Sequence, residues 1–586
     1  MIQQTYQWLV RLFTRPHVDE RIFALVIAAI IGILSGYGAV LFRLMIKLGQ
    51  YAFYRNTHDI LTFAHSLPVY YLIGLPSLGG LFVGLIVKYG ASEARGHGVP
   101  EVMEAVALRD GRIRKRVAAV KIMASAICIG SGGSVGREGP IVQIGSSLAS
   151  TISQIFKVSR VRQKTMVGCG AAAGIAATFN APIAGVLFAL EILLGDFGLA
   201  SFSPVVLASV TATTISRHYF GDFPAFVIPT YQLKSLWEFA LYPFLGLLAG
   251  GVGLIFITTL YKTEDLFDAA KMPQWLKPAL GGFFLGLILL KWPHVFGVGY
   301  GAINEALLND LPGLFLLSLV FVKIAATSIT LGSGGSGGIF APSLFIGAMA
   351  GGFFGWAVNL LFPGITASPG AYALVGMGAV VAGTTHAPIT AILIIFEMSG
   401  NYKIILPMMI TSILSAIVAV SLKKGSIYTI KLLRRGVDIS GGMEQNILKT
   451  LRVKDFMTNE VATVPESMTL VNLINTFKTQ NASYLHVVNE NNDLTGIISF
   501  RDIRALLEEH ALHHLVVAKD VATTNVETVK PSDSILVALE IMGEKGISQL
   551  PVVGGEDGKK VIGTLRHKDV IAAYDKAVIR REIEMV

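Results

Sequence analysis

Three glycine-rich motifs hold the residues of this sequence that are best suited to chemistry. They are Gly-His-Gly-Val-Pro at 96–100, Gly-Arg-Glu-Gly-Pro at 136–140 and Gly-Gly-Ile-Phe-Ala-Pro at 337–342. Glycines before a proline are typical of a loop that enters a helix, with the proline in the first turn. A helix start presents unpaired backbone N–H groups and the positive end of the helix dipole, so several starts brought together would bind a small anion. The alternative is that the glycines only permit close helix packing.

Glu138 is the ionisable residue of the second motif that could act as a switch. When ionised, a carboxylate beside helix starts can occupy the anion site itself. When protonated, it loses that attraction and can swing away, so opening of the site would depend on protons. An ionisable residue at membrane depth is a functional hypothesis by default. The alternative is a structural ion pair with the neighbouring Arg137.

Two halves of the chain are copies of one unit. Gly-Ser-Gly-Gly-Ser occurs at 130–134 and again at 332–336, and 9 of the 14 paired positions from Lys121 and Lys323 through the final serines are identical. Duplicated halves interrupted by Gly and Pro at corresponding positions indicate a transporter site at the repeat interface. The two lysines either keep the field positive for anions or extend to the cytoplasmic interface.

Composition indicates that most of the chain lies in a lipid bilayer. Of the 586 residues, 53% are hydrophobic and 15% are charged, whereas ordinary soluble domains have about 25% charged residues. Stretches of about twenty residues without Asp, Glu, Lys or Arg have the length that crosses a hydrocarbon core. They are residues 22–42, 66–87, 165–190, 240–261 and 404–422, and the longer stretch 324–396 is enough for several helices.

Positive charge flanks the apolar part and predicts its orientation. Basic residues precede the first span and follow the last, at Arg11, Arg15, Arg21, Lys423, Lys424, Lys431, Arg434 and Arg435. This pattern predicts a multi-pass protein of the inner or plasma membrane with both termini cytoplasmic. The net charge of +9 follows from that topology and does not indicate a nucleic-acid partner.

The sequence gives no sign of enzyme chemistry or of a metal site. Cys128 and Cys169 both lie in apolar surroundings, which does not suggest a disulfide framework. The 12 histidines show no ligand spacing. No convergent set of nucleophile and base is apparent either, so we do not expect an enzyme.

After about residue 440 the sequence becomes that of a soluble α/β module. Strand-length apolar runs alternate with helical patterns such as Leu470–Thr479 and Ile535–Lys545. The module is itself duplicated, because Gly496 leads to Asp502 at the spacing at which Gly563 leads to Asp569. The segment resembles a tandem pair of CBS (cystathionine-β-synthase) domains over residues 450–575.

The CBS resemblance implies an adenine nucleotide, ATP first, as a ligand between the repeats, while no cofactor is required. In that family a Gly-x-x-Ser/Thr-x-x-Asp turn places the aspartate on the ribose hydroxyls. Ser499 and Asp502 complete this motif in the first repeat. The second repeat keeps Asp569 but has Arg566 at the hydroxyl position, where Arg566 and Lys568 could instead meet phosphates. The alternative is a dimerising module without a ligand.

The order of the three motifs, closed by Tyr428 beyond the last span, resembles the CLC family of chloride channels and chloride/proton antiporters. The resemblance covers nearly the whole chain. It implies an all-α polytopic membrane domain built from two inverted repeats, followed by a cytosolic α/β CBS-pair domain. It also implies a homodimer with one pore in each subunit, and chloride or a similar small monovalent anion together with protons as the transported ions. By position it assigns the gate to Glu138 and the anion site to Gly96, His97, Gly98, Val99, Pro100, Gly136, Arg137, Gly139, Pro140, Gly338, Ile339, Phe340, Ala341 and Tyr428.

Two residues depart from the family pattern. His97 stands where the family usually has a serine and offers a ring N–H donor, which leaves the preference between chloride and nitrate open. Its side chain could also point away and leave coordination to the backbone. Ile192 occupies the position of the inner proton-pathway glutamate of family antiporters, and isoleucine cannot hold a proton. Glu191 lies about 100° round the helix, and its repeat partner Glu397 favours a structural role.

The sequence therefore favours a channel-like or weakly proton-coupled anion pore modulated by CBS domains. A chloride (or nitrate)/proton antiporter is the alternative. A nucleotide-sensing membrane receptor is a remote alternative, since it would need no duplicated helix starts. The expected domains are an N-terminal segment (1–20), a transmembrane domain (21–430, with repeats at about 21–200 and 235–425), a linker (431–450), CBS 1 (451–510) and CBS 2 (514–576).

Overall fold

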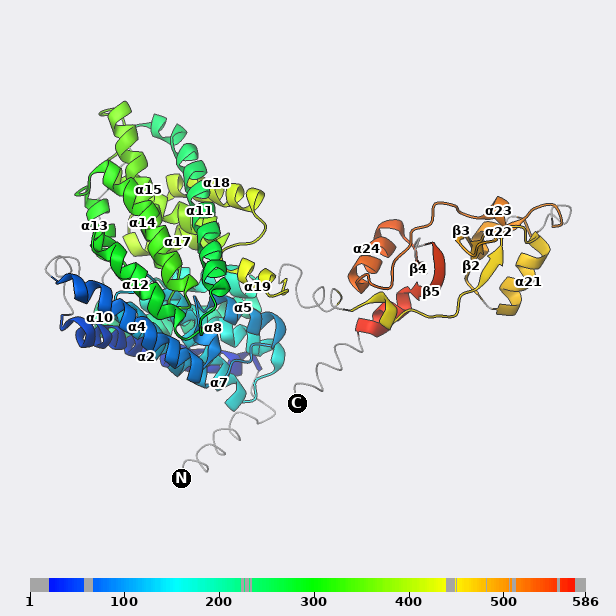
Figure 1. Ribbon diagram of the computed structural model, residues 1–586, viewed down its shortest axis with the longest axis horizontal. Coiled ribbons are helices and arrows are strands. Elements are labelled where there is room, and N and C mark those ends of the chain that lie inside the picture. Colours follow the sequence, from blue (N-terminus) through cyan, green and yellow to red (C-terminus); the bar gives the residue numbers. More distant parts are fainter. Residues whose placement is uncertain are drawn as a thin grey trace, which may run out of the picture. The chain divides into compact units, whose positions relative to one another are not determined.

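The computed structural model describes residues 20–56, 67–222, 226, 231, 234–438, 448, 451–480, 482–504, 506–507, 513–555 and 559–574. The chain forms two compact units, Met1–Val437 and Asp438–Val586 (Figure 1). In its described part the larger unit is built from helices, and the smaller unit combines short strands with helices.

The first half of the larger unit combines long helices with short ones, and α5 (Val99–Leu108) and α7 (Glu138–Ile155) begin at the first and second glycine-rich motifs. Its helices are α2 (Glu20–Tyr54), α4 (Val69–Tyr89), η1 (Ser92–Ala94), α5 (Val99–Leu108), α6 (Arg116–Gly130), α7 (Glu138–Ile155), α8 (Arg160–Phe179), α9 (Pro182–Phe188), the π-helix η2 (Ala189–Leu194) and α10 (Leu199–Phe220).

The second half repeats this order. Its helices are η3 (Leu236–Ala240), α11 (Tyr242–Ala269), α12 (Lys277–Leu289), η4 (Pro293–Val295), α13 (Tyr300–Leu308), α14 (Gly313–Gly332), α15 (Phe340–Leu361), α16 (Pro369–Thr385), α17 (Pro388–Ser399), η5 (Tyr402–Ile404), α18 (Ile405–Leu422) and α19 (Thr429–Arg434).

Seven helical stretches among the described residues are long and apolar enough to cross a membrane. Helices α7, α8, α15 and α16 lie at the centre of the unit, where α7 packs against α8 and α15 against α16. Their side chains are buried on nearly all faces. Helices such as α2, α4 and α18 instead present large apolar side chains on one face, as expected of a surface in contact with lipid.

One predicted span is interrupted. The charge-free stretch 165–190 forms two helices, because α8 ends at Asn180, which has the left-handed φ of 57°, and α9 begins at Pro182. Proline cannot continue the hydrogen-bonded ladder of α8 but fits the first turn of a new helix. The repeat shows the same break at His386 and Pro388, between α16 and α17.

The smaller unit contains two similar modules. In the first, β1 (Thr463–Pro465) pairs parallel with β2 (Tyr484–Val488), which pairs antiparallel with β3 (Leu494–Ser499). In the second, β4 (Gln549–Gly554) pairs antiparallel with β5 (Lys560–Arg566). In the described part of this unit the helices are η6 (Val453–Asp455), α21 (Leu470–Gln480), α22 (Phe500–Arg504), α23 (Ala518–Val521) and α24 (Ile535–Lys545). Each module buries its own apolar cluster.

Candidate functional site

The three glycine-rich motifs lie side by side and are hydrogen-bonded to one another. Gly96 donates its N–H to Gly335 O at 3.0 Å and accepts from Gly337 N at 3.3 Å. Gly136 and Gly338 exchange two hydrogen bonds, of 2.7 and 2.6 Å. The predicted convergence of the starts of α5, α7 and α15 is therefore present, although the three segments are far apart in the sequence.

Close approach of the backbones requires glycine at this point. A Cβ on Gly139 would lie 2.2 Å from the carbonyl oxygen of His97, which is far inside contact distance. Gly98, which precedes α5, has a φ of 82°, a conformation that glycine adopts without strain. The glycines thus do both things that the sequence offered as alternatives. They permit close packing, and this close packing allows the helix starts to converge.

The carboxylate of Glu138 lies at the start of α15. The side chain is 1% exposed. Its Oε2 accepts from Ala341 N at 3.4 Å, and its Oε1 accepts from Tyr300 Oη at 3.0 Å. Within the described part of the chain, Arg137 forms no ion pair with Glu138. The Arg137 guanidinium carbon instead lies 5.2 Å from the centroid of the Tyr300 ring.

Tyr300 is a member of this site that the sequence analysis missed. It is the first residue of α13 and follows Gly299, just as Val99 follows Gly98 at the start of α5. In the sequence, the offset of 202 between Lys121 and Lys323 pairs Tyr300 with Gly98, one residue away from its structural equivalent Val99. The repeat therefore gave no signal for a tyrosine at this position.

His97 and Tyr428 lie together near the same loops. Their ring centroids are 6.0 Å apart, and the side chains are 4% and 1% exposed. His97 Nδ1 has no hydrogen-bond partner among the described residues. The backbone before Tyr428 is held in place by Tyr261, whose hydroxyl donates to Ile427 O at 2.6 Å.

The two repeat-related lysines do not extend to an interface. Lys121 and Lys323 are each 0% exposed. Lys121 Nζ donates to Ala94 O at 3.0 Å and to Gly96 O at 2.8 Å. Lys323 Nζ makes the equivalent bonds in the second half, to Val295 O at 3.2 Å and Gly297 O at 3.1 Å. Each lysine therefore fixes the loop that leads into a short helix, α5 or α13.

Glu191 and Glu397 each accept hydrogen bonds from the start of a helix in the opposite half of the repeat. Glu191 accepts from Ile389 N at 3.2 Å and from Thr390 N at 2.7 Å, at the start of α17. Glu397 accepts from Ile183 N at 3.0 Å and Ala184 N at 2.7 Å, at the start of α9. Carboxylates at helix starts satisfy unpaired N–H groups and complement the helix dipole. These contacts give Glu191 and Glu397 a structural role, as the sequence favoured.

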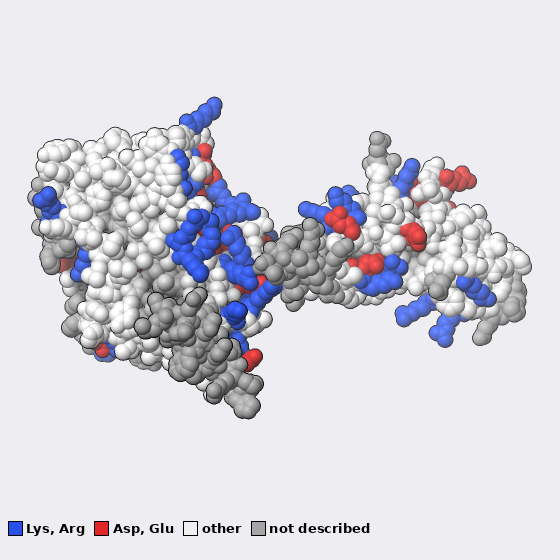
Figure 2. Space-filling view, turned by 90° about the horizontal axis from the view of Figure 1, so that it is seen from below, with Lys and Arg blue, Asp and Glu red and all other residues white. Residues whose placement is uncertain are grey.

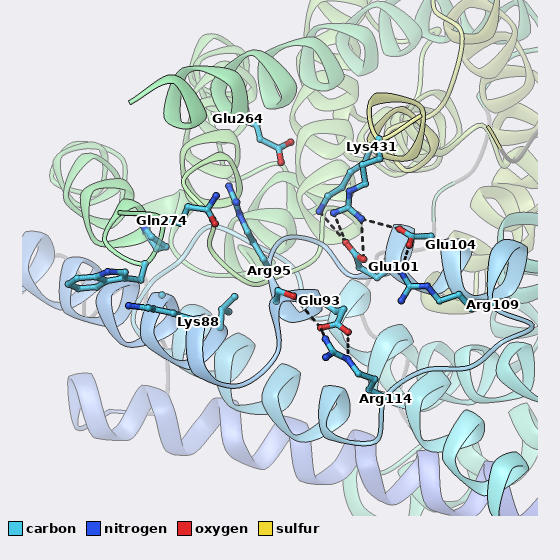
Figure 3. A pocket seen from close by; sticks show the side chains of 17 residues that line it. Lys88, Glu93, Arg95, Glu101, Glu104, Arg109, Arg114, Glu264, Gln274 and Lys431 are labelled. Carbon is cyan, nitrogen blue, oxygen red and sulfur yellow. Dashed lines mark hydrogen bonds and ion pairs between the residues drawn. The ribbon is translucent and has the colours of Figure 1, made fainter. Parts of the chain in front are cut away.

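A cavity of about 850 Å³ opens beside the first motif, and we call it the Lys431 cavity (Figure 3). Lys431 Nζ lies 2.9 Å from the position that a Cβ on Gly96 would take. The lining has more basic than acidic side chains, namely Lys88, Arg95, Arg109, Arg114, Lys431 and Arg435 against Glu93, Glu101, Glu104 and Glu264. Figure 2 shows Lys and Arg gathered along one side of the larger unit, whose remaining visible surface is mostly uncharged.

Ion pairs hold the wall of the Lys431 cavity. Arg435 Nη2 lies 2.9 Å from Glu101 Oε1, and Arg435 Nη1 lies 3.2 Å from Glu104 Oε2, which ties the end of α19 to α5. Glu93 pairs with Arg114. Burial raises the pKa of Glu93, but the hydrogen bond and charge of Arg114 outweigh burial and bring this pKa below its ordinary value.

A second cavity, of about 340 Å³, reaches Tyr300 and Arg137, and we call it the Tyr300 cavity. Arg43 and Lys47 of α2 also line it, and the described lining residues include no carboxylate. The Lys431 cavity and the Tyr300 cavity are therefore both lined by more basic than acidic side chains, which raises the local concentration of anions.

The smaller unit contains a cavity of about 880 Å³, the CBS cavity, lined by residues of both modules. Arg566 and Lys568 contribute positive charge, and Arg566 also donates to Thr458 Oγ1 at 2.8 Å. Burial lowers the pKa of His486, which lines the same cavity, although a hydrogen bond to Ala462 O acts in the opposite direction.

The two predicted aspartates of the smaller unit lie differently. Asp569 Oδ2 accepts from Arg566 N at 3.1 Å and Nε at 3.0 Å, next to the CBS cavity. Asp502 accepts from the backbone and side chain of Ser499 at 2.6 and 2.8 Å, and neither residue is among those that line the cavity. None of Ser499, Asp502 and Asp569 lines the cavity, and of the two aspartates Asp569 is the one that is bonded to a lining residue, Arg566.

Comparison with known protein families shows which family the chain belongs to. The family model described as voltage gated chloride channel matches residues 79–420, more than half of the chain. The chain belongs to the CLC family. The CBS domain model matches residues 453–509 and 518–576. The predicted fold class, an all-α membrane unit followed by an α/β CBS pair, is confirmed.

Individual CLC proteins resemble the chain over most of their length. A protein of Ralstonia nicotianae, named as ClcB-like, is 36% identical over 420 residues, which are 71% of this chain and 97% of the relative. Chloride channel protein CLC-f of Arabidopsis thaliana is 32% identical over 87% of this chain and 74% of its own length. CLC proteins are membrane transporters of anions rather than enzymes, and this chain is accordingly a multi-pass membrane protein.

Solved structures agree with this assignment. The crystal structure of a slow cyanobacterial Cl⁻/H⁺ antiporter is 27% identical, with a TM-score of 0.64, and covers 71% of this chain and 98% of that chain. A eukaryotic CLC transporter is 20% identical, with a TM-score of 0.63 over 94% of this chain and 99% of that chain, and shows the shared fold.

Proposed function

We propose that the chain moves chloride across the membrane along the glycine-rich loops, past a gate formed by Glu138. The observation that carries the proposal is the position of the Glu138 carboxylate, 3.4 Å from the Ala341 N–H at the start of α15. That position is where the start of α15 would stabilise a transported anion. The Lys431 cavity is lined by Arg95, next to the first motif, and the Tyr300 cavity is lined by Arg137 of the second motif, so anions have a charged approach from each.

The gate follows from competition for one site. Ionised Glu138 acts as a tethered anion and excludes chloride. Protonation removes its charge and therefore its attraction to the start of α15, so that chloride takes its place. Flux should accordingly increase as the pH falls.

We further propose that coupling to protons is weak. Ile192 has no group that holds a proton, and the neighbouring Glu191 already accepts hydrogen bonds at the start of α17. The second candidate function is chloride/proton antiport. The similarity to a structure described as a slow Cl⁻/H⁺ antiporter favours this second function.

Chloride efflux from proteoliposomes tests the proposed transport. Vesicles that contain the purified chain should release chloride faster than protein-free vesicles in the same gradient, and faster at pH 5 than at pH 7.5. Equal efflux from both kinds of vesicle would contradict the proposal.

His97 is proposed to set the preference among anions, because its ring lies 6.0 Å from that of Tyr428 and its Nδ1 has no partner among the described residues. We expect His97→Ser to change the chloride/nitrate permeability ratio by about two- to tenfold, since one hydrogen bond contributes a net free energy of about 0.5–1.5 kcal/mol. Reversal potentials in mixed chloride and nitrate measure the ratio. An unchanged ratio would mean that the side chain does not reach the anion.

We propose a homodimer with one pore in each subunit and with both termini in the cytoplasm. The basic residues at the end of the last span support this orientation. We also propose the domain boundaries that are expected from the sequence.

The CBS cavity is proposed to bind ATP or another adenine nucleotide. Arg566 and Lys568 are the cations that would meet the phosphates, because both line the cavity, whereas burial lowers the pKa of His486 and so disfavours a positive charge on that residue. Charge-assisted hydrogen bonds to phosphate are stronger than neutral ones.

We expect Arg566→Ala and Lys568→Ala each to weaken ATP binding to the full-length chain by roughly tenfold, as measured by calorimetry in detergent. Asp502→Ala is the comparison variant. A larger loss from Asp502→Ala than from Arg566→Ala would move the site to the turn of the first module. No heat with ATP, ADP or AMP at millimolar concentration would instead leave dimerisation as the role of the pair.

A further inference from the structure

We propose that Tyr300 is a positioning residue of the gate, whose hydroxyl holds ionised Glu138 in the anion site and thereby sets the pH at which the path opens. The inference rests on the proposed function of Glu138 and goes beyond it, because it names a second side chain that determines when the gate opens. Tyr300 belongs to α13, in the other half of the repeat from Glu138 of α7.

The hydrogen bonds to Glu138 are unequal. The bond from Tyr300 Oη to Oε1 measures 3.0 Å, whereas the bond from Ala341 N to Oε2 measures 3.4 Å. A hydrogen bond from a neutral donor to a carboxylate is stronger when the acceptor is ionised. The tyrosine bond therefore favours the ionised, seated form of Glu138 over the protonated form.

The tyrosine ring is itself held in place. Gly299, with a φ of 86°, directly precedes α13, and Lys323 fixes the loop before it through Val295 O and Gly297 O. The ring lies edge-on to Phe226, with the centroids 5.3 Å apart, and Arg137 lies over its face at 5.2 Å. A ring fixed on several sides presents its hydroxyl at a defined position, as a positioning residue must.

The repeat indicates that the hydroxyl is not needed to build α13. The equivalent short helix α5 begins with Val99 after Gly98, and its loop is held by Lys121 in the same way. The fold thus forms this helix start without a hydroxyl. The tyrosine occurs in the half whose short helix faces Glu138.

Other charged or titratable groups face this pair and would remain after removal of the hydroxyl. Electrostatic interactions link Glu138 with Arg137, with Lys323 of α14 and with Tyr428, and they link Tyr300 with Arg43 of α2. His294 and Lys47 line the Tyr300 cavity as well. These groups are the same in wild type and in Tyr300→Phe. A difference in pH dependence between the two proteins would therefore be due to the Tyr300 hydroxyl.

The test is the pH dependence of chloride efflux from proteoliposomes for wild type, Tyr300→Phe, Glu138→Gln and the double variant. Phenylalanine keeps the ring contacts with Phe226 and Arg137 and removes only the hydroxyl. We expect Tyr300→Phe to shift the midpoint of the pH dependence upward by about one unit, which corresponds to a tenfold smaller seated population. In the Glu138→Gln background, Tyr300→Phe should cause no further shift.

Tyr231→Phe is the matched control, because the Tyr231 hydroxyl donates to Leu307 O at the other end of α13, whereas the hydrogen bonds to the Glu138 side chain among the described residues come from Tyr300 and Ala341. Its pH profile should coincide with that of wild type. If Glu138→Gln flattens the profile but Tyr300→Phe leaves the midpoint unchanged, the role of Tyr300 is wrong and the gate stands. If Glu138→Gln keeps the wild-type pH dependence, the proposed gate is wrong and the role of Tyr300 falls with it. An equal midpoint shift in Tyr231→Phe would also overturn a specific role for Tyr300.

Discussion

Replacement of Glu138 by glutamine is expected to keep chloride flux and to remove most of its pH dependence. Glutamine resembles the protonated side chain in shape and carries no charge at any pH, so it cannot compete with chloride for the start of α15 through its charge. At pH 7.5, where the wild-type gate is mainly closed, we expect flux through Glu138→Gln to exceed wild-type flux by about tenfold or more. A population difference of that size corresponds to about 1.4 kcal/mol, which the loss of one charge-assisted hydrogen bond can supply.

Efflux measured between pH 4.5 and 8 checks this expectation. Asp196→Asn is a suitable control, because Asp196 is an exposed carboxylate of the same unit that bonds to Gly198 N and Ser201 Oγ. This control should keep the wild-type profile. If Glu138→Gln instead stayed as sensitive to pH as wild type, another group would operate the gate, and His97 would be the first to examine.

The second large effect concerns stability. We expect Lys121→Met to lower the free energy of unfolding by about 1–3 kcal/mol, because two buried hydrogen bonds from Lys121 Nζ, to Ala94 O and Gly96 O, are lost. Each hydrogen bond contributes a net free energy of about 0.5–1.5 kcal/mol, and each oxygen keeps a second donor, Ser336 Oγ for Ala94 and Gly337 N for Gly96. Flux should decrease as well, since Gly96 belongs to the loop that carries His97.

Thermal unfolding in detergent, followed by tryptophan fluorescence, measures the effect on stability. Lys323→Met should be similarly destabilising, because Lys323 makes the equivalent bonds in the second half. The exposed Lys271 provides a control in Lys271→Met. A wild-type unfolding midpoint for Lys121→Met would show that the buried amine contributes little to the fold.

The local features of the site could be predicted from the sequence because they depend on neighbouring residues. Glycine followed by proline indicated where helices begin, and α7 and α15 do begin at the second and third motifs. The duplication paired Glu191 with Glu397, and the structure shows them capping α17 and α9 reciprocally. In each case a short pattern or an internal comparison carried the information.

Features that depend on contacts between distant segments could not be predicted in the same way. Tyr300 meets Glu138 across 162 residues of sequence, and no pattern around Tyr300 distinguishes it from other tyrosines. The burial of Lys121 was missed because a lysine before an apolar helix more often reaches water along the helix surface. The break at Asn180 was missed because charge-free composition does not reveal where a helix turns back.

The smaller unit shows the same limit. The motif of Ser499 and Asp502 is complete in sequence, yet these two residues bond to each other and do not line the CBS cavity. Arg566 departs from the motif but contributes to the lining. Which half of a duplicated module faces an opening depends on how the two halves pack, and the motif of one half does not contain that information.

The central claim, a chloride pathway with little proton coupling, is tested most directly by recording chloride and protons in the same vesicles. Proteoliposomes with an outward chloride gradient and equal pH on both sides are monitored with a chloride electrode and a pH electrode. We predict chloride efflux well above that of protein-free vesicles, together with proton uptake at the level of the protein-free control. Uphill proton uptake in a fixed ratio to chloride efflux would contradict weak coupling, and the absence of chloride efflux would contradict the pathway itself.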